Sequence, residues 1–318
     1  MARFAIRTLE FDKVKNMLAA KAATALGKTA VLNQQIESDF KKVNRLQEET
    51  AEALRVMESK RFPFGGAFNI TAELKRAELG GVLEPLELQQ IQTTAASIKA
   101  MKNFLAENTE LAPVLAELGN NLQIFSRLEK QIESVIDDQG EIKDTASPKL
   151  HGLRNAIQIA KNRVKEKLES LLHDPNNQKY FQDNLVTMRG DRYVIPIKQE
   201  YKMNFPGVVH DQSSTGATLF IEPMAVLNLN NDIKRYTVEE KEEVERILRQ
   251  LTENVGKEAP ALLASLDIMT DIDAICARAA LAEEQHAVRP ELLVDGRLEI
   301  VQGRHPLLNK DTVVPLDV

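Results

Sequence analysis

Residues 147–171, SPKLHGLRNAIQIAKNRVKEKLESL, decide the fold of this chain. Ser147 followed by Pro148 is a helix cap followed by a first-turn proline, so a helix is predicted to start there. The apolar residues that follow alternate at spacings of three and four, and they are Leu150, Leu153, Ile157, Ala160, Val164, Leu168 and Leu171. This heptad spacing is typical of a coiled-coil seam rather than of a broad globular face.

A partner helix for this seam is predicted later in the chain. Its apolar residues lie mostly at helical spacing, and they are Leu229, Ile233, Tyr236, Val244, Ile247, Leu251 and Val255. The two helices can pair antiparallel, and a helix of roughly 25 to 35 residues reaches about 40 to 50 Å. The sequence therefore predicts a long lever, with an outgoing helix over 147–184 and a returning helix over 223–258 that ends near Pro260.

Between these two helices the apolar period changes from helical to β. Short β-type runs are predicted at residues 186–188, 193–197, 207–210 and 217–221. The segments 189–192 and 213–216 suit hairpin turns, while Pro196 is tolerated at a sheet edge or bulge. Residues 185–222 are therefore predicted to form a small β-rich clamp at the tip of the lever.

The rest of the chain favours helix, and the predicted fold class is mainly α. Aromatic content of 5% without any Trp is unlike a sandwich or barrel, and 318 residues suggest about two domains. Residues 1–146 are predicted to form a helical core, in which Asp39 caps one amphipathic helix. Residues 259–291 are predicted to add one more core helix. A short β hairpin is expected over 292–301, with its turn at Asp295 and Gly296.

Bulk charge and cysteine content limit the possible functions. The formal net charge is −6, so any nucleic-acid site must be a local basic patch. The single Cys276 cannot form an intrachain disulfide, and its place on an apolar helical stripe predicts a buried core residue. The sequence has no apolar run of about 18 residues and no signal-peptide core at its start, so a cytoplasmic location without membrane contact is expected.

Four basic residues in the predicted clamp are the candidate nucleic-acid contacts, because Lys and Arg are the natural partners of phosphate. They are Arg189, Arg192, Lys198 and Lys202. Four acidic residues in the same segment balance this charge, and they are Asp191, Glu200, Asp211 and Glu222. A solvated surface therefore stays open as the alternative interpretation.

The outgoing lever helix also carries many cations. These are Lys149, Arg154, Lys161, Arg163, Lys165 and Lys167, and the returning helix carries Glu239, Glu240, Glu242, Glu243 and Glu245. Charge pairing across the two helices explains both runs without any ligand.

No catalytic or metal-binding arrangement is predicted in this chain. The five histidines have no spacing that makes a metal pair with Cys276. Asp271 and Asp273 are two residues apart on a helix and point in different directions. Residues 26–29, LGKT, end like a phosphate-binding loop, but Ala22 stands where that loop needs glycine and the surroundings are helical.

Three segments resemble a known family. Residues 303–306, GRHP, followed by 313–318, VVPLDV, resemble the start of the ATPase domain of MutS proteins. Residues 138–150, DQGEIKDTASPKL, and 9–14, LEFDKV, resemble the second bacterial branch, MutS-two. The resemblance covers essentially the whole chain. It implies a core, lever and clamp that stop before the phosphate-binding loop, with 292–318 as the first strands of a truncated ATPase domain.

The resemblance also implies a function for the intact protein. It would be an ATPase that uses ATP and Mg²⁺, carries a carboxy-terminal Smr endonuclease domain and dimerises through the ATPase. Its implied targets are branched DNA, with suppression of homologous recombination, and stalled or collided ribosomes, which the family splits with ATP. No cofactor and no enzymatic activity are expected of this chain alone.

One residue near the end of the chain receives a role from the same resemblance. Val313 matches a position that is commonly aromatic and stacks on adenine, so valine leaves only an apolar contact. Arg304 and His305 follow a glycine at a predicted strand-to-loop junction and are expected to anchor structure rather than to catalyse.

A passive coiled-coil scaffold whose β tip binds protein is the alternative, and the balanced charge at the tip leaves it open. A free-standing enzyme is disfavoured, because it needs a catalytic constellation that the spacing does not provide.

Overall fold

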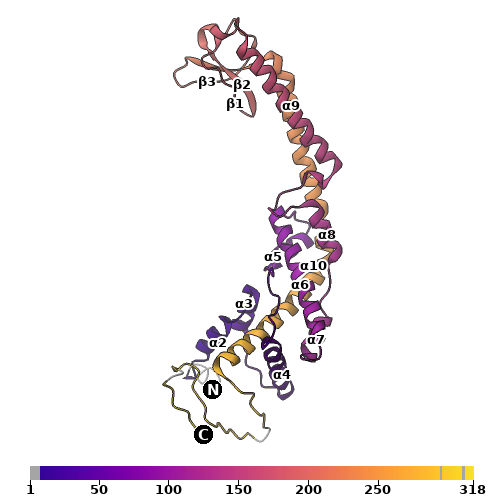
Figure 1. The fold of residues 1–318 in the computed structure, drawn as a ribbon, viewed down its shortest axis with the longest axis vertical. Helices are drawn as coiled ribbons and strands as arrows, with labels where there is room; N and C mark the ends of the chain where they lie inside the picture. The colour runs from indigo at the N-terminus through magenta and orange to yellow at the C-terminus, as the bar shows by residue number, and fades with distance from the viewer. Residues whose placement is uncertain (1–7, 294–295, 310–311) are drawn as a thin grey trace. The chain divides into compact units, whose positions relative to one another are not determined.

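The computed structural model describes residues 8–293, 296–309 and 312–318 (Figure 1). The fold is mainly α with one small antiparallel sheet, which confirms the predicted class. The chain forms two compact units. The core unit comprises residues 1–133 and 251–318, and the lever unit comprises residues 134–250.

The amino-terminal part of the core unit is a series of helices. They are α2 (Phe11–Ala19), α3 (Ala25–Asn33), α4 (Phe40–Met57), α5 (Thr71–Glu78), α6 (Pro85–Glu107), α7 (Pro113–Asn120) and α8 (Ser126–Val135). Asp39 caps α4 as predicted, because its Oδ1 accepts a hydrogen bond from the backbone N–H of Lys42 at 2.9 Å. Proline at the first turn of α6 and α7 fits positions where no N–H partner is needed.

The last helix, α10 (Leu227–Gln285), is continuous over 59 residues and contributes to both units. The predicted break near Pro260 is therefore wrong, because Pro260 lies inside the helix. An interior proline costs about 3 kcal/mol. Val255, Ala259 and Leu262 around it are fully buried, and burying a large apolar side chain contributes about 1.5–3 kcal/mol. Burial on both sides of Pro260 thus outweighs the lost hydrogen bond.

The lever unit contains the predicted coiled coil, formed by α9 (Pro148–His173) and the first part of α10. The Oγ of Ser147 accepts a hydrogen bond from the N–H of Leu150 at 3.0 Å, which confirms the predicted cap. The buried residues of α9 are Leu150, Leu153, Ile157, Ala160, Val164, Leu168 and Leu172. Only Leu172 differs from the predicted seam, which ended at Leu171. Leu171 is only partly buried.

The outgoing helix ends at His173 and not at residue 184 as predicted. Asp174 has left the helical region with ψ of 119°. Pro175 follows it, and the residue before a proline is sterically pushed out of the helical conformation. Residues 174–184 are therefore a connection with one short 3-10 turn, η2 (Gln178–Tyr180).

The clamp is a four-stranded antiparallel sheet in the order β1-β2-β4-β3, and Figure 1 shows its labelled strands at the end of α9. The strands are β1 (Thr187–Arg189), β2 (Arg192–Lys198), β3 (Gly207–Gln212) and β4 (Thr218–Pro223). They coincide with the four predicted β-type runs. The sheet and the outer half of the lever share one core, which includes Leu168, Phe181, Ile197, Phe205 and Ile221.

Local backbone chemistry explains two features of this sheet. Gly190 and Asp191 both have positive φ, at 53° and 61°, as a two-residue hairpin turn between β1 and β2 requires. The carbonyl of Pro196 accepts from the N–H of Gln182, so the proline nitrogen faces the side of β2 on which β1 has already ended. Pro196 is not at a sheet edge, because residues 181 and 182 pair with β2 on this side, and it is tolerated since no ladder hydrogen bond needs its missing N–H.

The segment after α10 differs from the predicted hairpin over 292–301. Residues 294 and 295, at its turn, lie outside the described residues. In the described part, the N–H of Ile300 donates to the carbonyl of Val318 at 2.8 Å, and that of Gly303 donates to Leu316 at 2.8 Å. The backbone partners of Ile300 and Gly303 thus come from residues 316–318, which a local hairpin pattern cannot indicate. Among the described helices, none combines the length and apolar character that a membrane span needs.

Candidate nucleic-acid interface

Arg189 lies at the end of β1 with its charge already paired. Its guanidinium stacks over the ring of Phe220, with 3.9 Å between the guanidinium carbon and the ring centroid. Its Nε donates to Oδ2 of Asp211 at 3.0 Å. The side chain is 36% exposed, so it reaches solvent, but it does so beside a carboxylate.

Arg192, the first residue of β2, is bound to a buried carboxylate. It donates to both oxygens of Glu222, at 2.7 and 3.0 Å, and also to Asn231 at 2.6 Å. The Glu222 side chain is 0% exposed, and it also contacts Asn230 at 2.8 Å and His210 at 2.6 Å. A buried carboxylate requires such partners, because an uncompensated charge in the interior is costly. Arg192 therefore balances a charge inside the clamp.

Lys198 and Lys202 differ from the two arginines, because neither forms an ion pair within the part of the chain that the structure describes. Lys198 ends β2 and lines a cavity of about 600 Å³ together with Gln182 and Gln199. Lys202 is exposed just after the 3-10 turn η3 (Gln199–Tyr201). Of the four predicted contacts, these two keep a positive charge without an ionic partner.

The predicted charge pairing between the two lever helices is confirmed only near the base of the lever. Arg154 donates to Glu240 at 2.8 Å, and Lys149 lies 3.6 Å from Glu243. Glu243 also accepts from Ser147 at 2.7 Å. Hydrogen bonds, first from Arg246 and then from Ser147, lower the pKa of Glu243 to about 2. The side chain of Glu243 is 2% exposed, so this network fixes the first turn of α9 against α10.

The outer basic residues of α9 take no part in such pairs. Lys161, Arg163 and Lys165 form no ion pair among the described residues, and Lys167 donates to the backbone carbonyl of Ala225 at 3.3 Å. Estimating the register of the two antiparallel helices from the sequence would have revealed these unpaired basic residues. In that register the acidic cluster at 239–245 faces residues 147–154 and not the outer half of α9.

The P-loop-like stretch lies in α3, as its helical surroundings predicted. Thr24 caps the helix, and the buried carboxylate of Asp273 accepts hydrogen bonds from the N–H groups of Ala23 and Thr24, both at 2.8 Å. A Cβ on Gly27 would lie 2.0 Å from Oδ2 of Asp273. The glycine therefore permits close packing of α3 on α10 and does not serve a phosphate.

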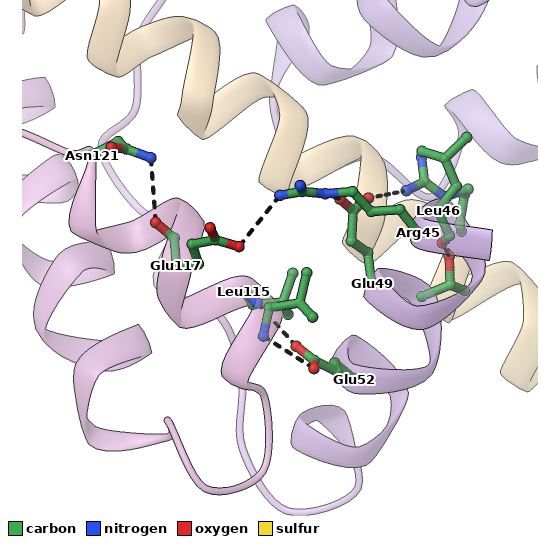
Figure 2. Close-up of polar contacts among 10 residues, drawn as sticks. Arg45, Leu46, Glu49, Glu52, Leu115, Glu117 and Asn121 are labelled. Carbon is green, nitrogen blue, oxygen red and sulfur yellow. Dashed lines mark hydrogen bonds and ion pairs between the residues drawn. The ribbon is translucent and has the colours of Figure 1, made fainter. Parts of the chain in front are cut away.

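The core unit holds a cavity of about 340 Å³ between α3, α4, α7 and α10. Figure 2 shows Glu49 of α4 beside Arg45, and Glu49 also contacts Arg278 at 3.4 Å. Burial lowers the pKa of Arg278, while Glu49 opposes this effect. Burial, followed by repulsion from Asp267, raises the pKa of Asp271 at the same cavity. Glu49 and Arg278 therefore compensate each other's charge at this cavity.

Glu52 stabilises the neighbouring helix. Its carboxylate accepts hydrogen bonds from the N–H groups of Val114 at 3.1 Å and Leu115 at 2.9 Å, at the start of α7 (Figure 2). An acceptor at a helix amino terminus satisfies orphan N–H groups and complements the helix dipole. This part of the core unit is therefore accounted for by helix packing.

Cys276 is buried as predicted, at 8% exposure, and burial raises the pKa of its thiol. No group of three or more His, Cys, Asp or Glu residues suited to a metal occurs within the described ranges. Val313 is half-buried, and its N–H donates to the carbonyl of Asn309 at 2.9 Å. Arg304 is exposed and reaches the carbonyl of Gln302 at 3.4 Å. The adenine contact of Val313 stays a prediction.

Comparison with known proteins gives the family. No family model matches the chain. A protein named endonuclease MutS2 from Symbiobacterium thermophilum is 44% identical over 314 residues, which cover 98% of this chain and 39% of the relative. Proteins of the same name from a Geobacillus species and from Bacillus velezensis are 43% and 38% identical, covering 98% and 100% of this chain.

A helical core with a coiled-coil lever and a β clamp, together with these relatives, identifies a MutS-family protein. Within that family, the chain belongs to the branch named endonuclease MutS2. It spans about two fifths of the length of the relatives it matches, at 39%, 40% and 41% of the three proteins.

Proposed function

We propose that this chain is the nucleic-acid-binding core, lever and clamp portion of a MutS-like ATPase. The observation that carries the proposal is the positive charge of Lys198 and Lys202 in the clamp, which no carboxylate among the described residues pairs with. Such lysines displace condensed counterions when they contact phosphate, which favours binding. Arg189 and Arg192 act mainly by holding the clamp together, with Arg189 offering partial exposure beside Asp211.

The intact protein is proposed to continue into a Walker-type ATPase that binds ATP and Mg²⁺, followed by an Smr endonuclease domain. Exposed apolar side chains after α10 support a further domain that covers them. Leu298, Val301 and Val314 are 76%, 73% and 82% exposed. Large apolar side chains that are exposed close together in sequence often mark a surface that another part of a protein covers. The test is whether the natural reading frame continues past Val318 into a GxxxxGK[ST] segment, and a stop at Val318 contradicts this part of the proposal.

The proposed targets of the intact protein are branched DNA, with suppression of recombination, and stalled or collided ribosomes. The intact protein is proposed to act in the cytoplasm as a homodimer through its ATPase. In this arrangement ATP moves the lever and the clamp, and Val313 makes an apolar contact with adenine. This chain alone is proposed to lack enzymatic activity. ATP turnover that persists through rigorous purification of the chain contradicts that proposal.

A salt series tests nucleic-acid binding by the chain itself. Anisotropy of a fluorescent DNA duplex is followed between about 50 and 200 mM NaCl, where each phosphate contact adds about 0.9 to the slope of log affinity against log salt. The proposal predicts a slope of at least about 2 in magnitude for two clamp lysines. The double variant K198Q/K202Q is expected to have a shallower slope, and a flat dependence for the unaltered chain contradicts the proposal.

A protein-binding scaffold is the second candidate, and exposed apolar residues of the clamp favour it. Met203 is 92% exposed, Met188 48% and Val208 41%. Large exposed apolar side chains at a protein surface can serve contacts with another protein. In this case association with nucleic acid is weak and salt-independent, so the same salt series separates the two candidates.

A further inference from the structure

The basic residues of α9 have two different environments along the helix. Near its base, Lys149 and Arg154 face Glu243 and Glu240 across the lever. Farther out, the helix carries Lys161, Arg163, Lys165 and Lys167, which are called the α9 basic strip below. Arg163, Lys165 and Lys167 are exposed, and Lys161 is half-buried.

The helix opposite the α9 basic strip offers almost no acidic partner. Two contacts set the antiparallel register, because Arg154 meets Glu240 and Lys167 meets the carbonyl of Ala225. The strip therefore faces residues 227–238 of α10, LNLNNDIKRYTV. Their one acid, Asp232, already bonds Arg235 at 3.0 Å.

Acids on α9 itself offset only part of the charge. Glu166 and Glu169 lie within the same stretch, so four cations stand against two carboxylates. The imbalance extends over the outer part of the lever unit, where residues 155–238 contain eleven Lys and Arg against nine Asp and Glu. The base of the unit has the opposite imbalance, because residues 134–154 and 239–250 contain six Lys and Arg against nine Asp and Glu. The acidic excess is therefore confined to the base.

The strip lies on both sides of the buried seam. Residues four apart on a helix share a face and are separated by about 6 Å along its axis. Lys161 and Lys165 thus form one pair, and Arg163 and Lys167 form the other. A duplex that lies along one side of the lever meets two cations of the strip, in the outer half next to the clamp.

We propose that the α9 basic strip is a phosphate-binding surface for a nucleic-acid duplex, and that it adds its charge to that of the two clamp lysines. This inference rests on the proposed function. It deepens that function by assigning a further phosphate contact to the lever helix. The chemistry recognised is the phosphodiester backbone, so DNA and RNA duplexes are both tested as ligands.

The experiment compares the salt dependence of duplex binding for three forms of the whole 318-residue chain. The first is unaltered, and the second is K161Q/R163Q/K165Q/K167Q. The control variant is K28Q/K41Q/K130Q/K257Q, which removes the same charge from exposed lysines of the core unit that form no ion pair among the described residues. Glutamine has nearly the helix propensity of lysine and arginine, and circular dichroism checks that the helices persist.

The strip variant is expected to lose about two from the magnitude of the salt slope and at least tenfold in affinity at low salt, while the control keeps its slope. The pair variants K161Q/K165Q and R163Q/K167Q then show which side of the lever faces the duplex. Equal slopes for the strip variant and the control overturn the inference and leave the proposed function standing. Absence of salt-dependent binding by the unaltered chain overturns both. A loss limited to DNA or to RNA identifies the duplex that the strip prefers.

Discussion

At the scale of single residues, the clamp is organised around the buried carboxylate of Glu222. Arg192, His210 and Asn230 all contact it, and the Glu222 side chain has no exposed surface. Removing one partner of a buried charge costs more than removing an exposed charge, because the remaining charge stays desolvated. Arg192 and Lys198 are both basic residues of β2, but Arg192 is expected to affect the stability of the clamp and Lys198 its binding of nucleic acid.

The variant R192M is expected to destabilise the lever unit by about 3 kcal/mol, because Glu222 loses its cation. The variant K198Q is the matched control and is expected to change stability by less than about 0.5 kcal/mol. All four tyrosines of the chain lie in the lever unit, so tyrosine fluorescence during urea unfolding reports on this unit. Equal stability of the two variants contradicts a structural role for Arg192.

Glu243 gives a pH-dependent prediction at the same scale. Its pKa is lowered from 4.5 to about 2, so its stabilising effect is complete above about 4.5 and is lost as the pH falls toward 2. The variant E243Q is expected to lower stability by about 1–2 kcal/mol at neutral pH, through its bonds to Arg246 and Ser147. The difference from the unaltered chain should shrink as the pH falls through this window.

Urea unfolding followed by tyrosine fluorescence at several pH values measures this difference. E242Q provides the control, since Glu242 is an exposed neighbour on the same helix. A difference for E243Q that stays constant down to pH 2 is incompatible with the lowered pKa.

The candidate contacts show how far residue types alone could lead. The sequence alone showed that the clamp segment contains four basic residues and four acidic residues that could balance them. It could not indicate that Glu222 is fully buried beneath Arg192, because their proximity depends on the pairing of β2 with β4. Likewise, the free charge on the outer half of α9 depends on which part of α10 faces it.

At the scale of elements, α10 shows a conflict between local chemistry and tertiary packing. Proline predicts a helix end, but Pro260 is exposed within a helix whose other face is buried. The proline ring removes the hydrogen bond to the carbonyl of Gly256 without displacing a core side chain. Packing of the apolar face therefore holds the helix through an unfavourable position.

The variant P260A is expected to stabilise the core unit by about 2 kcal/mol. Alanine restores the helix hydrogen bond, and this gain exceeds the cost of the greater conformational entropy of the unfolded chain without proline. Denaturant unfolding followed by far-ultraviolet circular dichroism measures the change. K257A is the control on the exposed face of the same helix and is expected to have little effect. Destabilisation by P260A would show that the helix needs the geometry that proline imposes.

Elements with strong local signals were predictable from the sequence. The cap at Ser147, the seam of α9 and the four strands of the clamp follow from heptad spacing, β alternation and turn residues. The pairing of Ile300 with Val318 was not predictable, because it joins segments without a local hairpin pattern. Continuity through Pro260 was missed since burial on both sides is a tertiary property.

At the scale of the whole molecule, charge is distributed unevenly. The chain has a net charge of −6, while residues 155–238 have more basic than acidic residues. A polyanion is repelled by an acidic protein in general but attracted by a local basic region. Nucleic acid is therefore expected to contact the outer part of the lever unit and to avoid the core unit.

Hydrogen–deuterium exchange of the chain with and without a saturating DNA duplex at low salt shows which part of the chain the nucleic acid contacts. Backbone amides in flexible or exposed parts of residues 155–238 are expected to exchange more slowly in the complex, with residues 8–133 unchanged. Slower exchange in the core unit alone, or no change anywhere at saturation, would contradict the account.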